Sequence, residues 1–205
     1  MKEYLMEFLG AMFLVLVVAL TGNPIAIGII LMSTVYIGGH VSGGHYNPAV
    51  TLAVWLRGKL KSKMVAGYMI SQLLGGIVAA WIYYMLKGSA FIPSRGSGVM
   101  FSHAILVELI FTFVLCSVVL TVATSKKFAG NYVYGLAIGL TLTAIAFAGG
   151  PISGGAFNPA VGLGPIIFSF FIGGWAGDFL IYLIGPFAGG YLAAIAFKYL
   201  NPGDA

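Results

Sequence analysis

Charged residues are scarce in this sequence. Of its 205 residues only 7% are Asp, Glu, Lys or Arg, whereas 60% are hydrophobic. A soluble domain carries about 25% charged residues, and the mean hydropathy here is +1.03. The composition therefore excludes a soluble fold and predicts an integral membrane protein with a single domain over residues 1–205.

Cysteine and catalytic groupings are also lacking. Cys116 is the single cysteine and lies inside an apolar run, so no disulfide can form within the chain and we interpret it as a packed structural thiol. The sequence has no Ser-His-Asp grouping, no paired carboxylates in one loop and no phosphate-binding loop. His40, His45 and His103 have no second ligand at metal spacing. We therefore expect no enzyme activity, no cofactor and no metal site.

The few charges are unevenly placed. The net charge is +5, but a six-span arrangement leaves only Lys87 and Arg95 on one side of the membrane. This positive-inside bias explains the charge without a nucleic-acid partner. It predicts a multi-pass protein with both termini cytoplasmic, and we expect it in the plasma membrane. The basic residues on the cytoplasmic side are Lys2, Arg57, Lys59, Lys61, Lys63, Lys126, Lys127 and Lys198.

Six apolar stretches are candidates for membrane spans, which need about 20 residues each. They form two similar halves, repeat one over about 1–88 and repeat two over about 101–205, with Glu7 matching Glu108 and Tyr68 matching Tyr182. Three spans per half is an odd number, so the second half must be inserted upside down. The predicted spans are residues 4–20, 25–39, 64–86, 101–124, 131–148 and 176–199.

One motif occurs twice, with its copies 111 residues apart. Residues 42–50 read Ser-Gly-Gly-His-Tyr-Asn-Pro-Ala-Val, and residues 153–161 read Ser-Gly-Gly-Ala-Phe-Asn-Pro-Ala-Val. The apolar stretches that follow, 49–56 and 160–170, are too short to cross a bilayer. They predict two half-helices that enter the membrane from opposite sides.

Each copy of the motif predicts a helix start. Asn47 and Asn158 can act as N-caps, with Pro48 and Pro159 at the first helical position, where a missing N–H costs nothing. Two helix N-termini that meet at the bilayer midplane form a positive electrostatic barrier. The asparagine amides there can donate hydrogen bonds but cannot titrate. The arrangement favours neutral, hydrogen-bonding solutes over cations and protons.

The backbone before each asparagine is expected to be non-helical, over residues 40–46 and 150–157. Such backbone is tolerated at membrane depth only where it lines a watery cavity or is buried in protein. We therefore expect its carbonyl groups to accept hydrogen bonds from a passing solute.

The doubled motif, Glu7 and Glu108 within the spans, and Gly164-Pro165 resemble the major intrinsic protein family of aquaporins and aquaglyceroporins. The resemblance covers almost the whole chain. It implies an all-α fold with six transmembrane helices and two re-entrant half-helices, assembled in lipid as a homotetramer. The implied function is a passive channel for water and small neutral solutes that excludes ions and protons. The motif residues expected at the pore are Asn47, Pro48, Ala49, Asn158, Pro159 and Ala160.

By the same resemblance, Glu7 and Glu108 accept hydrogen bonds from the re-entrant loops, and His45 braces the first loop. Spacing from the motifs places the selectivity filter at four uncharged positions. Most family members carry arginine at the last of these, so this filter is expected to be wider and is most similar to that of vacuolar-type members. The four filter positions are Ile27, Ala146, Gly155 and Val161.

Other functions remain open from the sequence. One is a facilitator of glycerol, urea, ammonia or hydrogen peroxide with low water permeability. A coupled secondary transporter is also built from inverted repeats, but it needs an ionisable group at the midplane, where the motifs place only amides. A junctional membrane protein would have to bind partners through the short connections near residues 88–98 and 125–130.

Overall fold

The computed structural model describes residues 1–174 and 177–204, in which the regular elements are helices joined by loops and no strand is present. Six helices are long and apolar enough to cross a membrane. Each overlaps one predicted span, so the predicted all-α class with six spans is confirmed. They are α1 (Lys2–Thr21), α2 (Pro24–Ser42), α4 (Ser62–Lys87), α5 (Phe101–Val119, continued by the π-helix η1, Leu120–Thr124), α6 (Tyr134–Ser153) and α8 (Phe179–Leu200).

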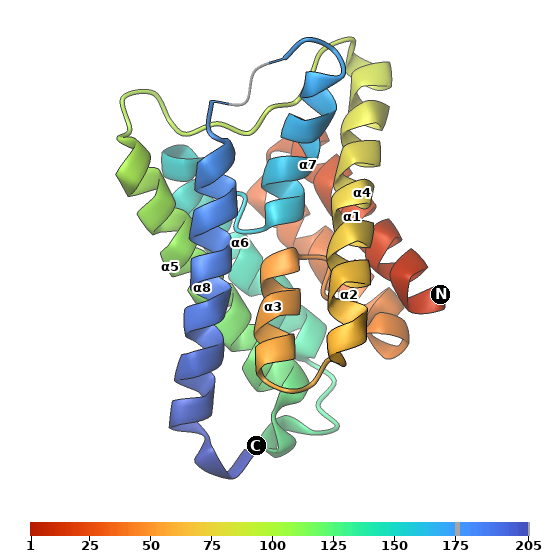
Figure 1. The fold of residues 1–205 in the computed structure, drawn as a ribbon, viewed down its shortest axis with the longest axis vertical. Coiled ribbons are helices and arrows are strands. Elements are labelled where there is room, and N and C mark those ends of the chain that lie inside the picture. Colours follow the sequence, from red (N-terminus) through yellow and green to blue (C-terminus); the bar gives the residue numbers. More distant parts are fainter. Residues whose placement is uncertain (175–176, 205) are drawn as a thin grey trace.

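Two short helices complete the fold, α3 (Pro48–Leu56) and α7 (Pro159–Phe170). Their N-termini meet near the centre of the molecule, and the helices run from there toward opposite ends (Figure 1). Both half-helices pack against α4 and α8. These are the two predicted half-helices, and the long helices around them hold the N-termini of α3 and α7 near the centre of the molecule.

The re-entrant loops are shorter than predicted, because α2 and α6 continue past the expected ends at residues 39 and 148. The predicted non-helical segments were 40–46 and 150–157, but residues 40–42 and 150–153 are helical. The non-helical loops are residues 43–47 and 154–158. The helices end where Gly43 (φ 92°) and Gly154 (φ 90°) adopt the left-handed conformation. Their N–H groups bond back to the carbonyls of Gly39 and Gly150, a glycine cap that only tertiary structure selects among the neighbouring glycines.

The predicted start of the last span, Ala176, lies outside the described residues, and α8 begins at Phe179. Likewise the span predicted from residue 131 begins at Tyr134, after the short 3₁₀ helix η2 (Lys126–Phe128). The 3₁₀ helix η3 (Pro202–Asp204) follows α8.

Glycines let the long helices approach closely. A side chain on Gly75 or Gly189 would come within 2.4 Å of a backbone carbonyl of α1 or α5, respectively. A side chain on the next residues, Gly76 and Gly190, would come within 2.5 and 2.6 Å of backbone carbonyls in the first turns of α7 and α3, respectively. Small residues serve this purpose in membranes, where helices associate through close packing. The two halves therefore use the same crossing in the same place.

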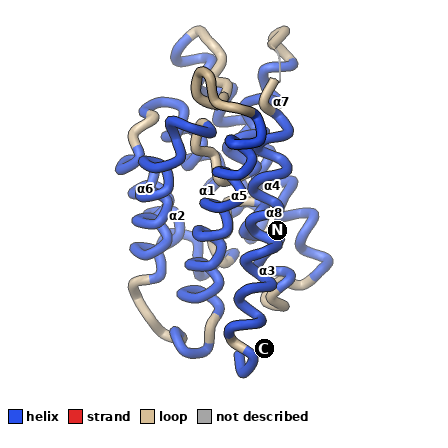
Figure 2. The backbone as a smooth tube through the Cα atoms, turned by 90° about the vertical axis from the view of Figure 1, so that its left-hand side faces the viewer, coloured by secondary structure: helices blue, strands red, loops and turns tan. Residues whose placement is uncertain are grey.

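The connections lie at two opposite ends of the molecule (Figures 1 and 2). The end drawn at the bottom of Figure 1 holds the turn after α3, the α5–α6 connection and the end of α8. We call it the basic face. The other end, the opposite face, holds the α4–α5 connection and the residues that follow α7. The connections and the helix end at the basic face carry Arg57, Lys59, Lys61, Lys63, Lys126, Lys127 and Lys198.

Candidate functional site

The two motif asparagines cap the half-helices. Asn47 Oδ1 accepts a hydrogen bond from the backbone N–H of Ala49 at 2.9 Å, and Asn158 Oδ1 accepts one from Ala160 at 2.8 Å. Each helix begins at the proline that follows its asparagine. The predicted N-caps are therefore confirmed in both copies.

The same asparagines also join the two halves. Asn47 Nδ2 donates to the carbonyl of Phe157 at 2.9 Å, and Asn158 Nδ2 donates to the carbonyl of Tyr46 at 2.9 Å. The two motifs thus meet through a reciprocal pair of hydrogen bonds between residues more than 100 positions apart. An amide NH2 group carries two hydrogens, so each asparagine keeps a second donor beyond this bond.

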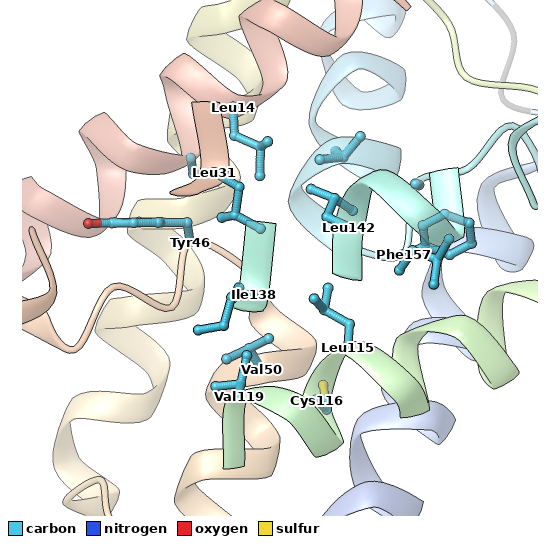
Figure 3. Packing of buried hydrophobic residues seen from close by; sticks show 14 of the residues in the cluster. Leu14, Leu31, Tyr46, Val50, Leu115, Cys116, Val119, Ile138, Leu142 and Phe157 are labelled. Carbon is cyan, nitrogen blue, oxygen red and sulfur yellow. The ribbon is translucent and has the colours of Figure 1, made fainter. Parts of the chain in front are cut away.

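Tyr46 and Phe157 present those carbonyls from an unusual backbone conformation. Their φ angles are 50° and 48°, and within residues 1–174 and 177–204 they alone are non-glycine residues with positive φ. Such a conformation costs about 1–3 kcal/mol per residue and requires support from its surroundings. Both rings are fully buried and point away from the centre, on opposite sides of it (Figure 3). Burial of these rings offsets the cost.

Glu7 holds the first re-entrant loop through both carboxylate oxygens. Oε1 accepts from the Ser42 hydroxyl at 2.6 Å and from the backbone N–H of His45 at 3.0 Å. Oε2 accepts from the backbone N–H of Tyr46 and from Gln72 Nε2, at 2.6 and 2.7 Å. The side chain is fully buried, and a buried carboxylate is costly without such donors. These bonds fix the loop against α1 and α4.

Glu108 holds the second loop in the same way. Oε1 accepts from the Ser153 hydroxyl at 2.7 Å and the backbone N–H of Ala156 at 3.0 Å. Oε2 accepts from the backbone N–H of Phe157 at 2.6 Å. The contacts to serine and backbone repeat those of the first half within about a tenth of an ångström, but no counterpart of Gln72 takes part.

A narrow cavity runs between the two loops. Its volume for a water-sized molecule is about 20 Å³. Both motif asparagines line it, with Ile27, Gly155 and Val161 of the predicted filter, whereas Ala146 is not among its lining residues. Among the motif residues expected at the pore, Pro48, Ala49, Pro159 and Ala160 are buried behind it.

The cavity wall is built from pairs of matching residues from the two halves. In seven of the eight pairs the two residues are of the same type, and the exception is His45 with Ala156. Figure 3 shows several of these aliphatic side chains facing a common centre. The matching pairs are Ile27 and Ile138, Leu31 and Leu142, Gly44 and Gly155, Asn47 and Asn158, Val50 and Val161, Leu14 and Leu115, and Val18 and Val119.

His45 is the one lining residue that breaks this symmetry. Its Nδ1 lies 3.1 Å from Thr51 Oγ1, and its ring stands edge-on to Tyr68 at 5.3 Å. Gln72 Nε2 also donates to the Thr51 hydroxyl at 2.8 Å. In the described part of the chain no three His, Cys, Asp or Glu side chains come together as metal ligands would. His45 is held by hydrogen bonding and ring packing.

The supporting roles of four residues were missed in the sequence. Gln72 and Thr51 bridge Glu7 and His45, and Ser42 and Ser153 each donate a hydrogen bond to a glutamate. The tyrosines that match between the halves donate to the carbonyls of those serines, at 2.8 Å in both cases. Their repetition in the sequence was the signal that could have identified them.

Comparison with known proteins agrees with this architecture. The sequence model of the family described as Major intrinsic protein matches residues 1–197. Glycerol uptake facilitator protein-like 6 of Lactiplantibacillus plantarum is 34% identical over 100% of both chains. Aquaporin AqpM of Methanothermobacter marburgensis is 33% identical over 86% of this chain and 75% of its own. The solved aquaglyceroporin from Plasmodium falciparum has the same fold, with a TM-score of 0.87 at 24% identity over 98% of this chain and 97% of its own.

Proposed function

This chain belongs to the major intrinsic protein family, whose members are channels and not enzymes; it is a passive channel for water and small solutes, and we propose that its two re-entrant loops exclude ions from the path. The observation that carries this proposal is the reciprocal bonding of Asn47 and Asn158. These bonds hold the N-termini of α3 and α7 together beside the central cavity.

Helix dipoles supply the barrier to cations. Each half-helix N-terminus is equivalent to about +0.5 of an elementary charge, and the two ends face each other near the centre of the molecule. A cation or a proton meets this positive potential, and none of the described residues that line the cavity has a negatively charged side chain. A neutral solute accepts a hydrogen bond from the asparagine amides instead.

The largely apolar wall and small volume of the cavity make solutes pass one at a time. Apart from Asn47, Asn158 and His45, all lining side chains are aliphatic or absent, so a solute can bond the protein at few points. The cavity volume of about 20 Å³ suits one water at a time, since a single water needs about 10–15 Å³ of such volume. Solutes therefore cross in single file.

We propose that Ile27, Ala146, Gly155 and Val161 form the selectivity filter, which then contains no positively charged side chain. Val161→Arg should lower urea and glycerol permeability more than water permeability in proteoliposomes, because it adds a long charged side chain to the wall. Val161→Met adds length without charge and should have a smaller effect. If both variants leave urea and glycerol permeability unchanged, this assignment of the filter is wrong.

The same assay separates the alternatives. Wild-type vesicles that shrink no faster than empty ones in an osmotic gradient would contradict a water channel. High solute flux with low osmotic permeability would favour the facilitator suggested by the glycerol relative. Flux that depends on an ion gradient would favour a coupled transporter. A vesicle that passes nothing would favour a junctional role.

The setting of the channel is also proposed. We infer a homotetramer in the plasma membrane with the basic face and both termini in the cytoplasm, and one channel domain made of repeats 1–88 and 101–205. Family membership and the placement of Arg57–Lys63 at the basic face support this orientation. Native mass spectrometry would test the oligomer, and protease protection of sealed vesicles would test the orientation.

A further inference from the structure

The chain has two aspartates and two arginines, and they pair with each other. Asp178 pairs with Arg95 on the opposite face at 3.4 Å, where the arginine side chain is 36% exposed. Asp204 pairs with Arg57 on the basic face at 3.6 Å, and both side chains are only 3% exposed. A buried ion pair costs more to assemble and more to break than an exposed one. The pair on the basic face is therefore the one to explain.

Asp204 joins three distant parts of the chain. It lies in η3, after α8, and its backbone carbonyl accepts a hydrogen bond from Arg57 Nη2, which directly follows α3. Its Oδ1 accepts from the backbone N–H of Lys126 at 2.9 Å, at the start of η2. The Arg57 guanidinium also lies over the Phe197 ring at 4.9 Å. One residue thus ties the end of a half-helix to the α5–α6 connection.

The two tied segments both contribute residues to the lining of one vestibule. This cavity of about 310 Å³ opens on the basic face. Val54 and Lys59 line it on either side of Arg57 in sequence, and Ala123 and Thr124 line it just before Lys126. His45 and Val119 line both this vestibule and the central cavity. The vestibule is therefore the mouth of the central cavity on the basic face.

The lining segment before Lys126 departs from regular α-helical backbone. Residues Leu120–Thr124 form a π-helix at the end of α5, and π-helical turns are uncommon and often occur at functional sites. Asn131 Nδ2 ties the following turn to the carbonyl of Val122 at 2.8 Å. Beyond that turn, Asp204 supplies a polar link from this connection to the residue that ends α3.

We propose that Asp204 is a positioning residue for the channel mouth: it latches the α5–α6 connection to the end of α3 and limits how far the vestibule opens. This inference rests on the proposed channel function and goes beyond it by assigning a part of the mouth to a residue outside the pore. The Ser125 hydroxyl and the Lys126 N–H hold the pKa of the Asp204 carboxyl below its usual value. The latch is therefore ionised at neutral pH.

Thiol labelling in detergent tests the latch directly. Val119 is 8% exposed and lines both cavities, so Val119→Cys reports access from the vestibule. The native Cys116 is fully buried and provides the unlabelled background. Adding Asp204→Asn should speed labelling about tenfold, since it weakens hydrogen bonds to a charged group. Asp204→Glu keeps the charge and should label within about twofold of the parent. An unchanged or slower rate with Asp204→Asn overturns the proposal.

A second pair of variants isolates the backbone bond by comparison. Lys126→Pro removes the backbone N–H that donates a hydrogen bond to Asp204. Lys126 is the first residue of η2, a position at which proline is tolerated. The preceding residue, Ser125, already has ψ 135°, as a residue before proline requires. Lys126→Ala is the matched control, because it removes the same side chain and keeps the N–H. Labelling should be faster with proline than with alanine, and equal rates would overturn the proposal.

The ion pair on the opposite face provides the control for general loosening. Asp178→Asn removes an ion pair of the same chemistry far from the vestibule and should leave Val119→Cys labelling unchanged. An equal acceleration in this variant would mean that the effect is not specific to the latch, and would overturn it. Osmotic permeability of the wild-type chain is measured in parallel. If that permeability is absent, the proposed function fails, whereas the labelling still decides the latch.

Discussion

The two halves of this protein agree where they face the cavity and differ one layer behind it. The lining pairs are identical in type at seven of eight positions, and the glutamate-to-loop distances match closely. Behind the first loop, Gln72 and Thr51 add a polar network. Behind the second loop, Pro186 and Gly162 occupy the corresponding positions, and neither carries a side-chain donor.

Close packing replaces the polar network in the second half. A Cβ atom on Gly162 would lie 2.3 Å from Cβ of Tyr182, so α7 and α8 touch where a threonine hydroxyl stands in the first half. The halves thus reach one loop geometry by two means, hydrogen bonding and direct contact. The comparison teaches that the loop backbone and the cavity wall are the shared requirement, and that the support behind them can vary.

The largest expected effect comes from disrupting the hydrogen bonds between glutamate and loop that the two halves share. In Glu7→Gln or Glu108→Gln the new NH2 group faces a backbone N–H of the loop in either orientation, because each carboxylate oxygen accepts one. We expect a loss of about 2–4 kcal/mol of unfolding free energy, since buried unsatisfied donors cost about 1–3 kcal/mol each. Unfolding in detergent measures this loss. Glu7→Gln should lose more, because the Gln72 bond to a charged oxygen is either lost or replaced by a bond to a neutral one, and the reverse order would contradict the comparison.

An intermediate effect tests the difference between the halves. Gly162→Ala forces a methyl group into the α7–α8 contact and should cost about 1–3 kcal/mol, as overpacking does. The corresponding Thr51→Ala removes one hydroxyl from the first network and should cost about 1 kcal/mol. Chemical unfolding of both variants gives the two values. If Gly162→Ala is neutral, close packing does not support the second loop.

The smallest effect should be the same in both halves. Tyr68→Phe and Tyr182→Phe each remove one hydroxyl that donates to a serine carbonyl at 2.8 Å. Each variant should lose about 1 kcal/mol, the usual net value of such a bond. Paired melting curves compare them, and a clear inequality would show that the halves differ even in their backbone support.

Local sequence predicted much of this fold. Apolar runs identified the six spans, and the Asn-Pro pairs identified the starts of both half-helices, because hydropathy and N-capping are properties of a few adjacent residues. The ends of α2 and α6 were predicted too early, at residues 39 and 148. Several neighbouring glycines could end each helix, and only the tertiary structure selects Gly43 and Gly154.

Long-range contacts were not predictable in this way. The donor from Gln72 to Glu7 spans 65 positions, and the Asp204 contact to Arg57 spans 147. Neither follows from spacing, since each depends on how helices from different parts of the chain cross. The filter residues were placed by resemblance, and of these Ile27, Gly155 and Val161 line the cavity, whereas the filter role of all four stays a prediction.

The crossed amide bonds also constrain how the molecule is made. As translation proceeds, the NH2 group of Asn47 lacks its carbonyl acceptor until Phe157 has been synthesised and inserted, and the Tyr46 carbonyl must wait for Asn158. Each half therefore completes its hydrogen bonding only when the other arrives. Assembly of this protein therefore includes the meeting of two unfinished halves, and that step creates both the midpoint of the pore and the crossed bonds between the halves.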